Sequence, residues 1–283
     1  MLRIFSVPGK GTSLALSWTL FALAVLLYLR VSQTRHIENP EDRIVPTLQQ
    51  LSAGFAHAVL QPAEEDDASD VPNHPSLTEQ IVHGMLWKDT LASAKRFLLA
   101  LLLMLPAVFL GLQMGAFPWI NRFLGRFVIF FDKIVALSVL PILFIAFGIG
   151  ELAKVMLMVI GVAPTIIMDT LNLTKSVPNE QVVRAFTLGA GDLGVTYRVI
   201  FPQIWPKVLN SIRLNLKSLV LFLFAGEMIA SQDGLAYRIA LMQRHMGMDV
   251  IIPYVLWTAL LLFLIDLTLR VVIRITNPWF REH

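Results

Sequence analysis

The sequence predicts an all-α integral membrane protein with about six transmembrane helices. Hydrophobic residues make up 56% of the 283-residue chain and charged residues only 15%, whereas soluble domains are about 45–50% apolar and about 25% charged. The charges lie between apolar runs of about 20 residues, the length that a helix needs to cross a bilayer. Because the chain has no cysteine, disulfides, thiolate metal sites and cysteine nucleophiles are excluded.

Six charge-poor windows predict the spans in order. The first two contain no charged residue, and the third and fourth carry charges only near their ends, where long side chains can reach the membrane surface. The uncharged part of the fifth and sixth is shorter, covering residues 218–226 and 250–265. The windows are residues 13–29, 97–117, 130–150, 152–172, 212–231 and 250–272.

The first window could also be a secretory signal peptide. However, its apolar core is about 16 residues long, and Leu27 to Arg30 lack the small residues of a cleavage site. We therefore expect residues 1–30 to be a short cytoplasmic stub followed by a retained first span.

The distribution of lysine and arginine orients the spans, because short basic loops face the cytoplasm. With six spans, the loops 118–129 and 173–211 and both termini fall on one side, and each of these segments is basic. The opposite segment, 31–89, carries ten acidic residues against three basic ones. Both termini are therefore expected in the cytoplasm.

Segment 31–89 is expected to be a partly flexible extracytoplasmic insertion before the core, residues 90–283. Residues 61–76 combine prolines with an acidic run that cannot bury apolar surface. From Leu77 to Phe97, apolar residues recur at helical spacing and predict an amphipathic helix leading into the second span.

Three side chains of the insertion, His74, Glu79 and His83, allow two interpretations. Glu79 and His83 are four residues apart on one helical face, as metal ligands can be. Histidines and acids without further ligand spacing are also common on solvated surfaces. We favour the solvated surface, so no metal site is predicted.

The polar loop between the fourth and fifth windows contains G-x-G-x-x-G at Gly189, Gly191 and Gly194. In dinucleotide-binding proteins this motif follows a buried strand and precedes an acidic residue by about 20 positions. Here polar residues precede it, and the next acid after Asp192 is Glu227. A Walker A sequence is also absent from the chain, so we expect it not to bind ATP itself.

The glycines instead predict a turn between two short helices, residues 180–188 and 195–201. This arrangement resembles the cytoplasmic loop of binding-protein-dependent ABC importer permeases, whose pattern is E-A-A, three residues, G, nine residues and I-x-L-P. Gly189 and Val199 to Pro202 keep that spacing, while Val183-Arg184-Ala185 replaces E-A-A.

The resemblance extends over about 200 residues and is greatest to the branch that imports nitrate, alkanesulfonates, taurine, bicarbonate and thiamine-precursor pyrimidines. Further matching segments follow in the family's order. They are Ser93 to Arg96, Leu140-Pro141 with Phe147 to Gly150, Pro202 with Pro206, Glu227-Met228, Gly234 to Tyr237, and Asp266 to Arg270.

The resemblance implies a type I ABC importer permease fold with a cytoplasmic coupling helix, in the bacterial inner membrane. It implies a non-catalytic transport subunit for a small polar solute or anion, with no cofactor of its own. ATP and magnesium would bind a separate P-loop ATPase, whose hydrolysis drives alternating access. A second permease subunit forming a homodimer, an extracytoplasmic solute-binding protein and membrane lipids are the further implied partners.

The resemblance also places three sets of site residues. The expected ATPase-coupling residues are Ala185, Leu188, Gly189, Ala190, Gly191, Val199, Phe201 and Pro202. The expected translocation pathway includes Ser138, Pro141, Phe144 and Glu227. The expected contacts with the binding protein are Gly234 and Leu235.

Two acids within the spans allow structural and functional interpretations. A buried Glu227 is by default a functional residue, but an ionised glutamate would repel an anion. We therefore favour a structural hydrogen bond or salt bridge over direct substrate contact. Asp266 lies four residues before Arg270, and an ion pair on one helical face is the simplest interpretation.

Two other functions are alternatives to transport. A non-transporting membrane scaffold could use residues 185–202 as a docking site without moving solute. A membrane enzyme would need a nucleophile and base at suitable spacing, which the sequence does not offer. A net charge of +3 gives no argument for nucleic acid.

Overall fold

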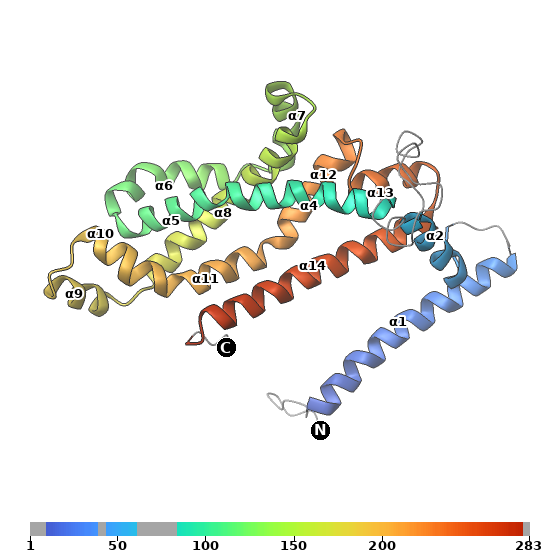
Figure 1. Cartoon of the computed structure of the whole chain (residues 1–283), viewed down its shortest axis with the longest axis horizontal. Coiled ribbons are helices and arrows are strands. Elements are labelled where there is room, and N and C mark those ends of the chain that lie inside the picture. Colours follow the sequence, from blue (N-terminus) through green and yellow to red (C-terminus); the bar gives the residue numbers. More distant parts are fainter. Residues whose placement is uncertain (1–9, 39–43, 61–83, 280–283) are drawn as a thin grey trace, which may run out of the picture.

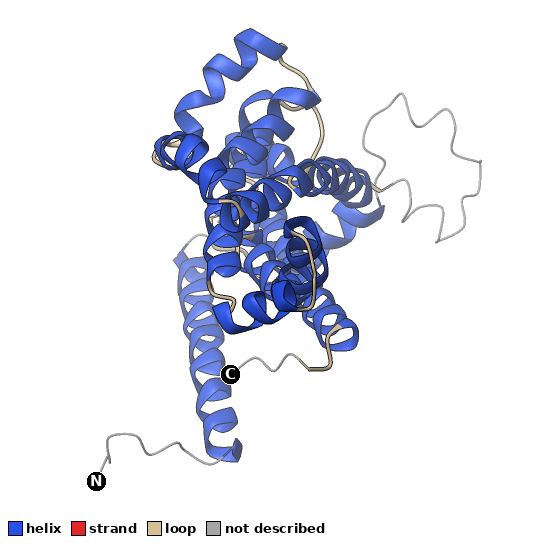
Figure 2. Cartoon of the chain, turned by 90° about the vertical axis from the view of Figure 1, so that its left-hand side faces the viewer, coloured by secondary structure: helices blue, strands red, loops and turns tan. Residues whose placement is uncertain are grey.

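The computed structural model describes residues 10–38, 44–60 and 84–279, and every regular element within these ranges is a helix (Figures 1 and 2). This confirms the predicted all-α class. The helices are α1 Lys10–Glu38, α2 Leu48–Leu60, α4 Met85–Leu103, α5 Leu105–Ala116, α6 Pro118–Asp132, α7 Ala136–Phe147, α8 Glu151–Lys175, α9 Asn179–Thr187, α10 Asp192–Gly194, η2 Val195–Ile200, α11 Phe201–Leu214, α12 Leu216–Ala230, α13 Leu235–Arg244 and α14 Met248–Thr276.

Helix α8 lies at the centre of the bundle and contacts α4, α5, α6, α7, α11 and α12. It is apolar around most of its circumference, as expected for a buried helix. Its residues Val155, Met158, Val162 and Ile166 are fully buried in the main core cluster, together with residues of α4, α5, η2, α11 and α12. The other spans are therefore positioned by their contact with α8.

Two glycines bring α5 unusually close to α8. A Cβ atom at Gly111 would lie 2.6 Å from the backbone oxygen of Ile167, and one at Gly115 would lie 2.4 Å from the Thr174 Cβ. Glycines four residues apart let two membrane helices pack backbone against side chain. The close α5–α8 contact therefore depends on these two missing side chains.

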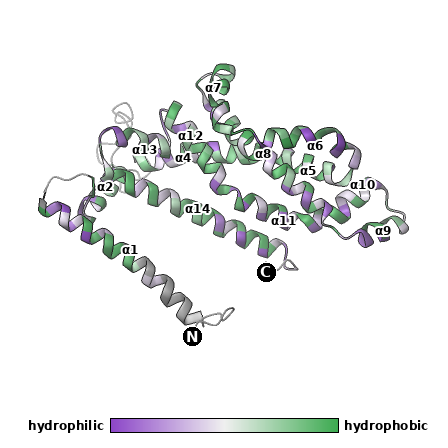
Figure 3. Ribbon diagram, turned by 180° about the vertical axis from the view of Figure 1, so that it is seen from behind, coloured by the Kyte–Doolittle hydropathy of each residue, from purple (hydrophilic) through white to green (hydrophobic). Residues whose placement is uncertain are grey.

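Three predicted spans coincide with helices long and apolar enough to cross a membrane, Met85–Ala116, Glu151–Lys175 and Met248–Thr276. The fifth coincides with a pair bent by 41°, Asp192–Leu214 and Leu216–Ala230. The first window lies within α1. The wide exposure of apolar side chains such as Leu256 is what lipid-facing helices require, and Figure 3 shows hydrophobic colours along much of α14.

The third span differs from the prediction. Residues 118–129, expected to form a loop, belong to helix α6, and α6 meets α7 at an angle of 97° across the break after Asp132. Pro118 begins α6 at a position where a missing N–H costs nothing. The third window is therefore half of a broken helix pair and not one straight span.

Part of the insertion is packed against the bundle. Helix α2 contacts α14 and α4, and its Ala58 is buried in a cluster with Leu86, Leu235 and Tyr254. A Cβ at Gly54 would lie 2.4 Å from the backbone oxygen of Asp249. Residues 61–83 lie outside the described residues. They include the acidic run and His74, Glu79 and His83, the three side chains considered as metal ligands.

Candidate functional site

The glycine-containing loop forms a small helical projection at one end of the bundle, which we call the knob, residues 179–200 (Figure 1). Its first helix, α9, ends one residue before the predicted position. After the turn come a single helical turn, α10, and a π-helix, η2, that continues into α11. The order helix, glycine turn, helix is confirmed, but the second helix is π-helical and not α-helical.

Gly189 makes the turn possible. Its φ of +85° lies in the left-handed region, and an added Cβ would meet nothing within 4 Å. Glycine is therefore required here by the backbone conformation, and not by a lack of room for a side chain. The amides of Gly189 and Ala190 donate to the carbonyls of Phe186 and Ala185, closing the end of α9. Because these amides are used inside the turn, they offer no phosphate cradle.

The predicted coupling residues divide into an inner and an outer set. Ala185, Ala190, Val199 and Phe201 pack against the main core and hold the knob in place. The outer set is exposed and consists of Leu188, Gly189, Gly191 and Pro202.

Three exposed apolar residues of the knob were missed by the sequence analysis, Val183, Phe186 and Leu193. With Leu188, which is 87% exposed, they give the α9–α10 segment four exposed apolar side chains, which we call the apolar patch. Their exposure could have been predicted from the sequence, because apolar residues on a short polar helix between two spans have no hydrophobic core nearby in which to be buried. The patch is the part of the knob that a partner can cover.

Tyr197 joins the knob to α5. Its ring stacks on Phe109 with centroids 6.2 Å apart, and its hydroxyl accepts a hydrogen bond from Gln113. Since α5 is held tightly to α8 through Gly111 and Gly115, the knob has contact with the centre of the bundle as well as with α11.

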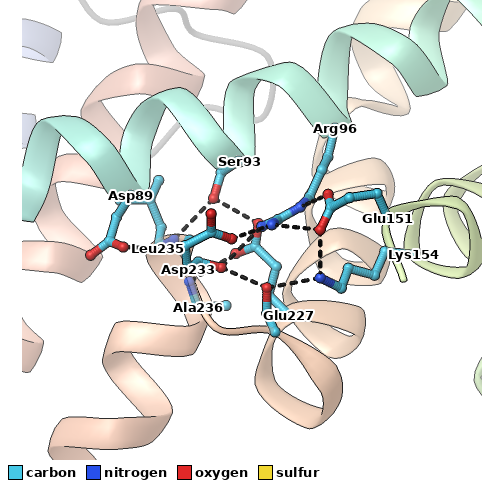
Figure 4. A network of polar contacts seen from close by, with 11 residues as sticks. Asp89, Ser93, Arg96, Glu151, Lys154, Glu227, Asp233, Leu235 and Ala236 are labelled. Carbon is cyan, nitrogen blue, oxygen red and sulfur yellow. Dashed lines mark hydrogen bonds and ion pairs between the residues drawn. The ribbon is translucent and has the colours of Figure 1, made fainter. Parts of the chain in front are cut away.

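A network of charges with a buried centre, which we call the buried network, lies toward the opposite end of the bundle, where α4, α12 and α13 meet (Figures 1 and 4). Its edge is open, since the side chains of Glu151 and Asp233 are 59% and 45% exposed. Arg96 of α4 is buried and binds three carboxylates from different elements. It donates to Glu227 of α12 at 2.8 Å, to Glu151 of α8 at 2.9 Å, and to Asp233 in the loop after α12. Lys154 also contacts Glu151, at 2.8 Å. One guanidinium thus ties three spans and a loop together.

The same network caps the N-terminus of α13, whose first amides have no partner within the helix. The amides of Gly234, Leu235 and Ala236 donate to Asp89, Ser93 and Glu227, each at 2.9–3.0 Å. Carboxylates are favourable at the positive end of a helix.

Gly234 allows this approach. Its φ is +117°, and an added Cβ would lie 2.6 Å from the carboxyl carbon of Glu227. Leu235 is also buried. Both residues predicted to contact the binding protein, Gly234 and Leu235, are therefore buried in this chain, and their contact with a partner remains a prediction.

Asp89 completes the network on the α4 side. It accepts from Arg238 at 2.9 Å and from Tyr254 at 3.1 Å. Burial by itself lowers the pKa of the Arg238 guanidinium, but its hydrogen bond and attraction to Asp89 outweigh burial and raise the pKa above its ordinary value. Arg238 therefore stays charged beside Asp89.

The remaining predicted residues fall as follows. Glu227 is fully buried and makes the ion pair expected from the sequence. On α7, Ser138 and Pro141 are exposed and Phe144 is half-buried, while the opposite face of α7 packs on α8.

Asp266 and Arg270 form the predicted pair at 2.9 Å. Within the described ranges, no three metal-ligating side chains gather.

The helical membrane bundle with a knob at one end defines this chain as a transport permease. Residues 107–282 match the family described as binding-protein-dependent transport system inner membrane component, and the chain belongs to that family. It is a membrane permease subunit of an ABC importer.

Known relatives agree with the family assignment. The chain is 31% identical to the taurine transport system permease protein TauC of Escherichia coli over 198 residues, which cover 70% of this chain and 72% of TauC. It is 29% identical to the putative ABC transporter permease protein MJ0413 of Methanocaldococcus jannaschii, over 66% of this chain and 71% of that protein.

The fold is also that of a solved transporter. A structure of the MetNI methionine ABC transporter in an inward-facing conformation has a TM-score of 0.57 to this chain, with 18% sequence identity. The match covers 68% of this chain and 94% of that one. At this identity the likeness concerns the fold alone, and it confirms the type I importer fold expected from the sequence.

Proposed function

We propose that this permease couples ATP hydrolysis on a separate ATPase to alternating access for a small polar solute or anion. The observation that carries the proposal is the knob, with its apolar patch of Val183, Phe186, Leu188 and Leu193. A patch of this kind on a short loop between spans is suited to a groove of a soluble partner. ATP and magnesium bind that partner.

The contacts of the knob offer a route for its motion. Residues 195–214 run continuously from the knob into α11, and α12 follows after a bend of 41°. Helix α12 carries Glu227, which binds Arg96 and the N-terminus of α13. When the ATPase subunits close on ATP, a shift of the knob would move α11 and α12 and so reach the buried network. The pathway would run along the exposed face of α7, between two copies of the chain.

Gly189 provides a direct test of coupling. A β-branched residue is strained at positive φ, so Gly189→Val should tilt α9 away from its docking position. Gly150→Val is the control, because Gly150 lies outside the knob, has an extended backbone with a φ of −135° and has open space around it. In proteoliposomes, we expect solute uptake to fall about tenfold or more for Gly189→Val and to persist for Gly150→Val.

Copurification separates this function from the scaffold alternative. A permease should bring down a P-loop ATPase and support ATP-dependent uptake, whereas a scaffold would bind a partner without moving solute. Absence of any ATPase from the purified complex would contradict the proposal.

The relatives suggest the first solutes to test. Because TauC is a taurine transport permease, we propose taurine and related sulfonates as substrates, delivered by an extracytoplasmic binding protein. Calorimetric titration of that protein with taurine, an alkanesulfonate, nitrate and bicarbonate would identify the substrate. Binding of none of these would place the substrate outside this group.

A further inference from the structure

An apolar groove of about 430 Å³ runs between α4, α12 and α14. Its volume is within the range of small-ligand pockets, about 300–1,000 Å³. All three helices belong to membrane-spanning segments, so the groove lies at the depth of the lipid chains. Its lining is formed mainly by aliphatic and aromatic residues, among them Phe97, Leu98, Leu223, Leu262 and Leu269.

The groove has no free hydroxyl donor for a polar ligand. Four of its lining residues carry hydroxyl groups, and all four hydroxyls donate their hydrogen within the chain. Thr90 donates to Leu86, Ser93 to Glu227, Thr258 to Tyr254 and Thr268 to Leu264, at distances of 2.6–2.8 Å. A polar solute entering the groove would therefore lose most of its hydrogen bonds with water, and any acceptor that it carries would find no hydroxyl donor. The occupant should be a hydrocarbon chain.

One end of the groove carries an excess of positive charge. Lys217 lies one helical turn before the lining residue Val220 on α12 and is exposed. Arg213 contacts Asp266 at 3.7 Å, and Arg270 contacts the same carboxylate at 2.9 Å. Two arginines thus share one carboxylate, and Lys217, four residues after Arg213, adds a further positive charge at this end of α12, which lies toward the knob and the expected cytoplasmic surface. Basic side chains at this depth attract anionic lipid headgroups.

We propose that the groove is a binding site for an anionic phospholipid, with one acyl chain between α4, α12 and α14 and the phosphate beside Lys217. The outer end of the groove reaches Ser93 and Leu235. Both residues take part in the cap on α13, so the bound chain supports the buried network.

Native mass spectrometry of the purified permease complex tests the proposal with phosphatidylglycerol and phosphatidylethanolamine as probes. We expect wild-type protein to retain phosphatidylglycerol in preference. Leu262→Trp fills the groove and should reduce the retained lipid about tenfold, because an occupied cavity cannot accept a chain. Lys217→Gln should reduce the preference for phosphatidylglycerol about fivefold, the contribution of one basic residue near a lipid surface.

Matched variants leave the groove intact. Leu256→Trp adds the same ring to an exposed position of α14, and Lys133→Gln removes an exposed lysine from the α6–α7 turn. Both should retain lipid as the wild type does. Equal retention in Leu262→Trp, or equal binding of the two lipids by the wild type, would overturn the proposal.

Helix α1 is the competing occupant, since it lies apart from α4, α12 and α14 in Figure 1 and could enter the groove in the membrane. The chain lacks cysteine, so paired cysteines at Leu23 and Leu98 report on this alternative without background. A high yield of that cross-link would assign the groove to α1, of the same or a second copy, and overturn lipid binding. Absence of the cross-link supports the lipid.

Discussion

At the scale of single residues, Arg96 and Glu227 carry the charge network. Their side chains are 4% and 0% exposed. The sequence identified Glu227, because an acid inside an apolar window is unusual. It matched Arg96 to a family motif but gave no partner, since the two residues are 131 positions apart and only the packing of α4 against α12 brings them together.

Breaking this pair should destabilise the protein strongly. Removing one member of a buried ion pair costs about 3–5 kcal/mol, because the other charge is left without its partner. We expect Arg96→Met and Glu227→Met each to lower the thermal stability of the solubilised permease. The double variant should lose less than the sum of the two. Additive losses, measured by fluorescence-detected size exclusion after heating, would show that the pair is not energetically coupled.

Gly234 should tolerate no side chain. An alanine there meets both an unfavourable φ of +117° and the Glu227 carboxylate. Strained backbone of this kind costs about 1–3 kcal/mol, and the overlap adds to it. Gly234→Ala should therefore lower the melting temperature, whereas Gly150→Ala, with open space and an extended backbone, should not. Equal melting temperatures for the two variants would refute this account.

At the scale of elements, hydropathy predicted most of the spans but not where they break. The hydropathy of residues 130–150 predicts one straight span, yet the axes of α6 and α7 meet at an angle of 97° within it. The cause is tertiary, because α6 packs on α5 and α8 while α7 turns away along α8. The helix α2 was likewise hidden in an insertion whose acidic part suggested flexibility. The glycine turn was predictable, because glycine has a local conformational meaning.

The close packing of α5 on α8 should be sensitive to added volume. Gly111→Leu would place a side chain where even a Cβ lies 2.6 Å from the Ile167 oxygen. Overpacking costs about 1–3 kcal/mol or more, and here it would also pull Tyr197 of the knob away from its contacts on α5. Both thermal stability and coupled ATPase activity should fall. Ala259→Leu, at an exposed position of α14, should leave both unchanged, and an effect of equal size in that control would contradict the packing argument.

At the scale of the whole molecule, the arrangement agrees with the charge pattern of the sequence. Figure 1 places α9, α10 and the α5–α6 turn at one end of the bundle, and α2 and α13 at the other. The turns predicted to face the cytoplasm thus share an end, as do the extracytoplasmic segments α2 and α13. Successive spans run in opposite directions, so alternate connections lie at the same end of the bundle. The orientation relative to the membrane itself follows from the positive-inside rule and remains a prediction.

Single cysteines test that orientation, since the chain contains none. Leu188, in the turn after α9, and Met246, in the turn before α14, are both exposed. Figure 1 shows α9 and α13 at opposite ends of the bundle. A membrane-impermeant maleimide should label Met246→Cys in spheroplasts, because the α13–α14 turn faces outward. It should reach Leu188→Cys only after the membrane is opened, because Lys175, Arg198 and Lys207 hold that loop inside. The cysteine-free parent gives the background, and permeabilised cells show that both sites react. Labelling of Leu188→Cys in sealed spheroplasts would reverse the topology and remove the knob from the reach of any cytoplasmic ATPase.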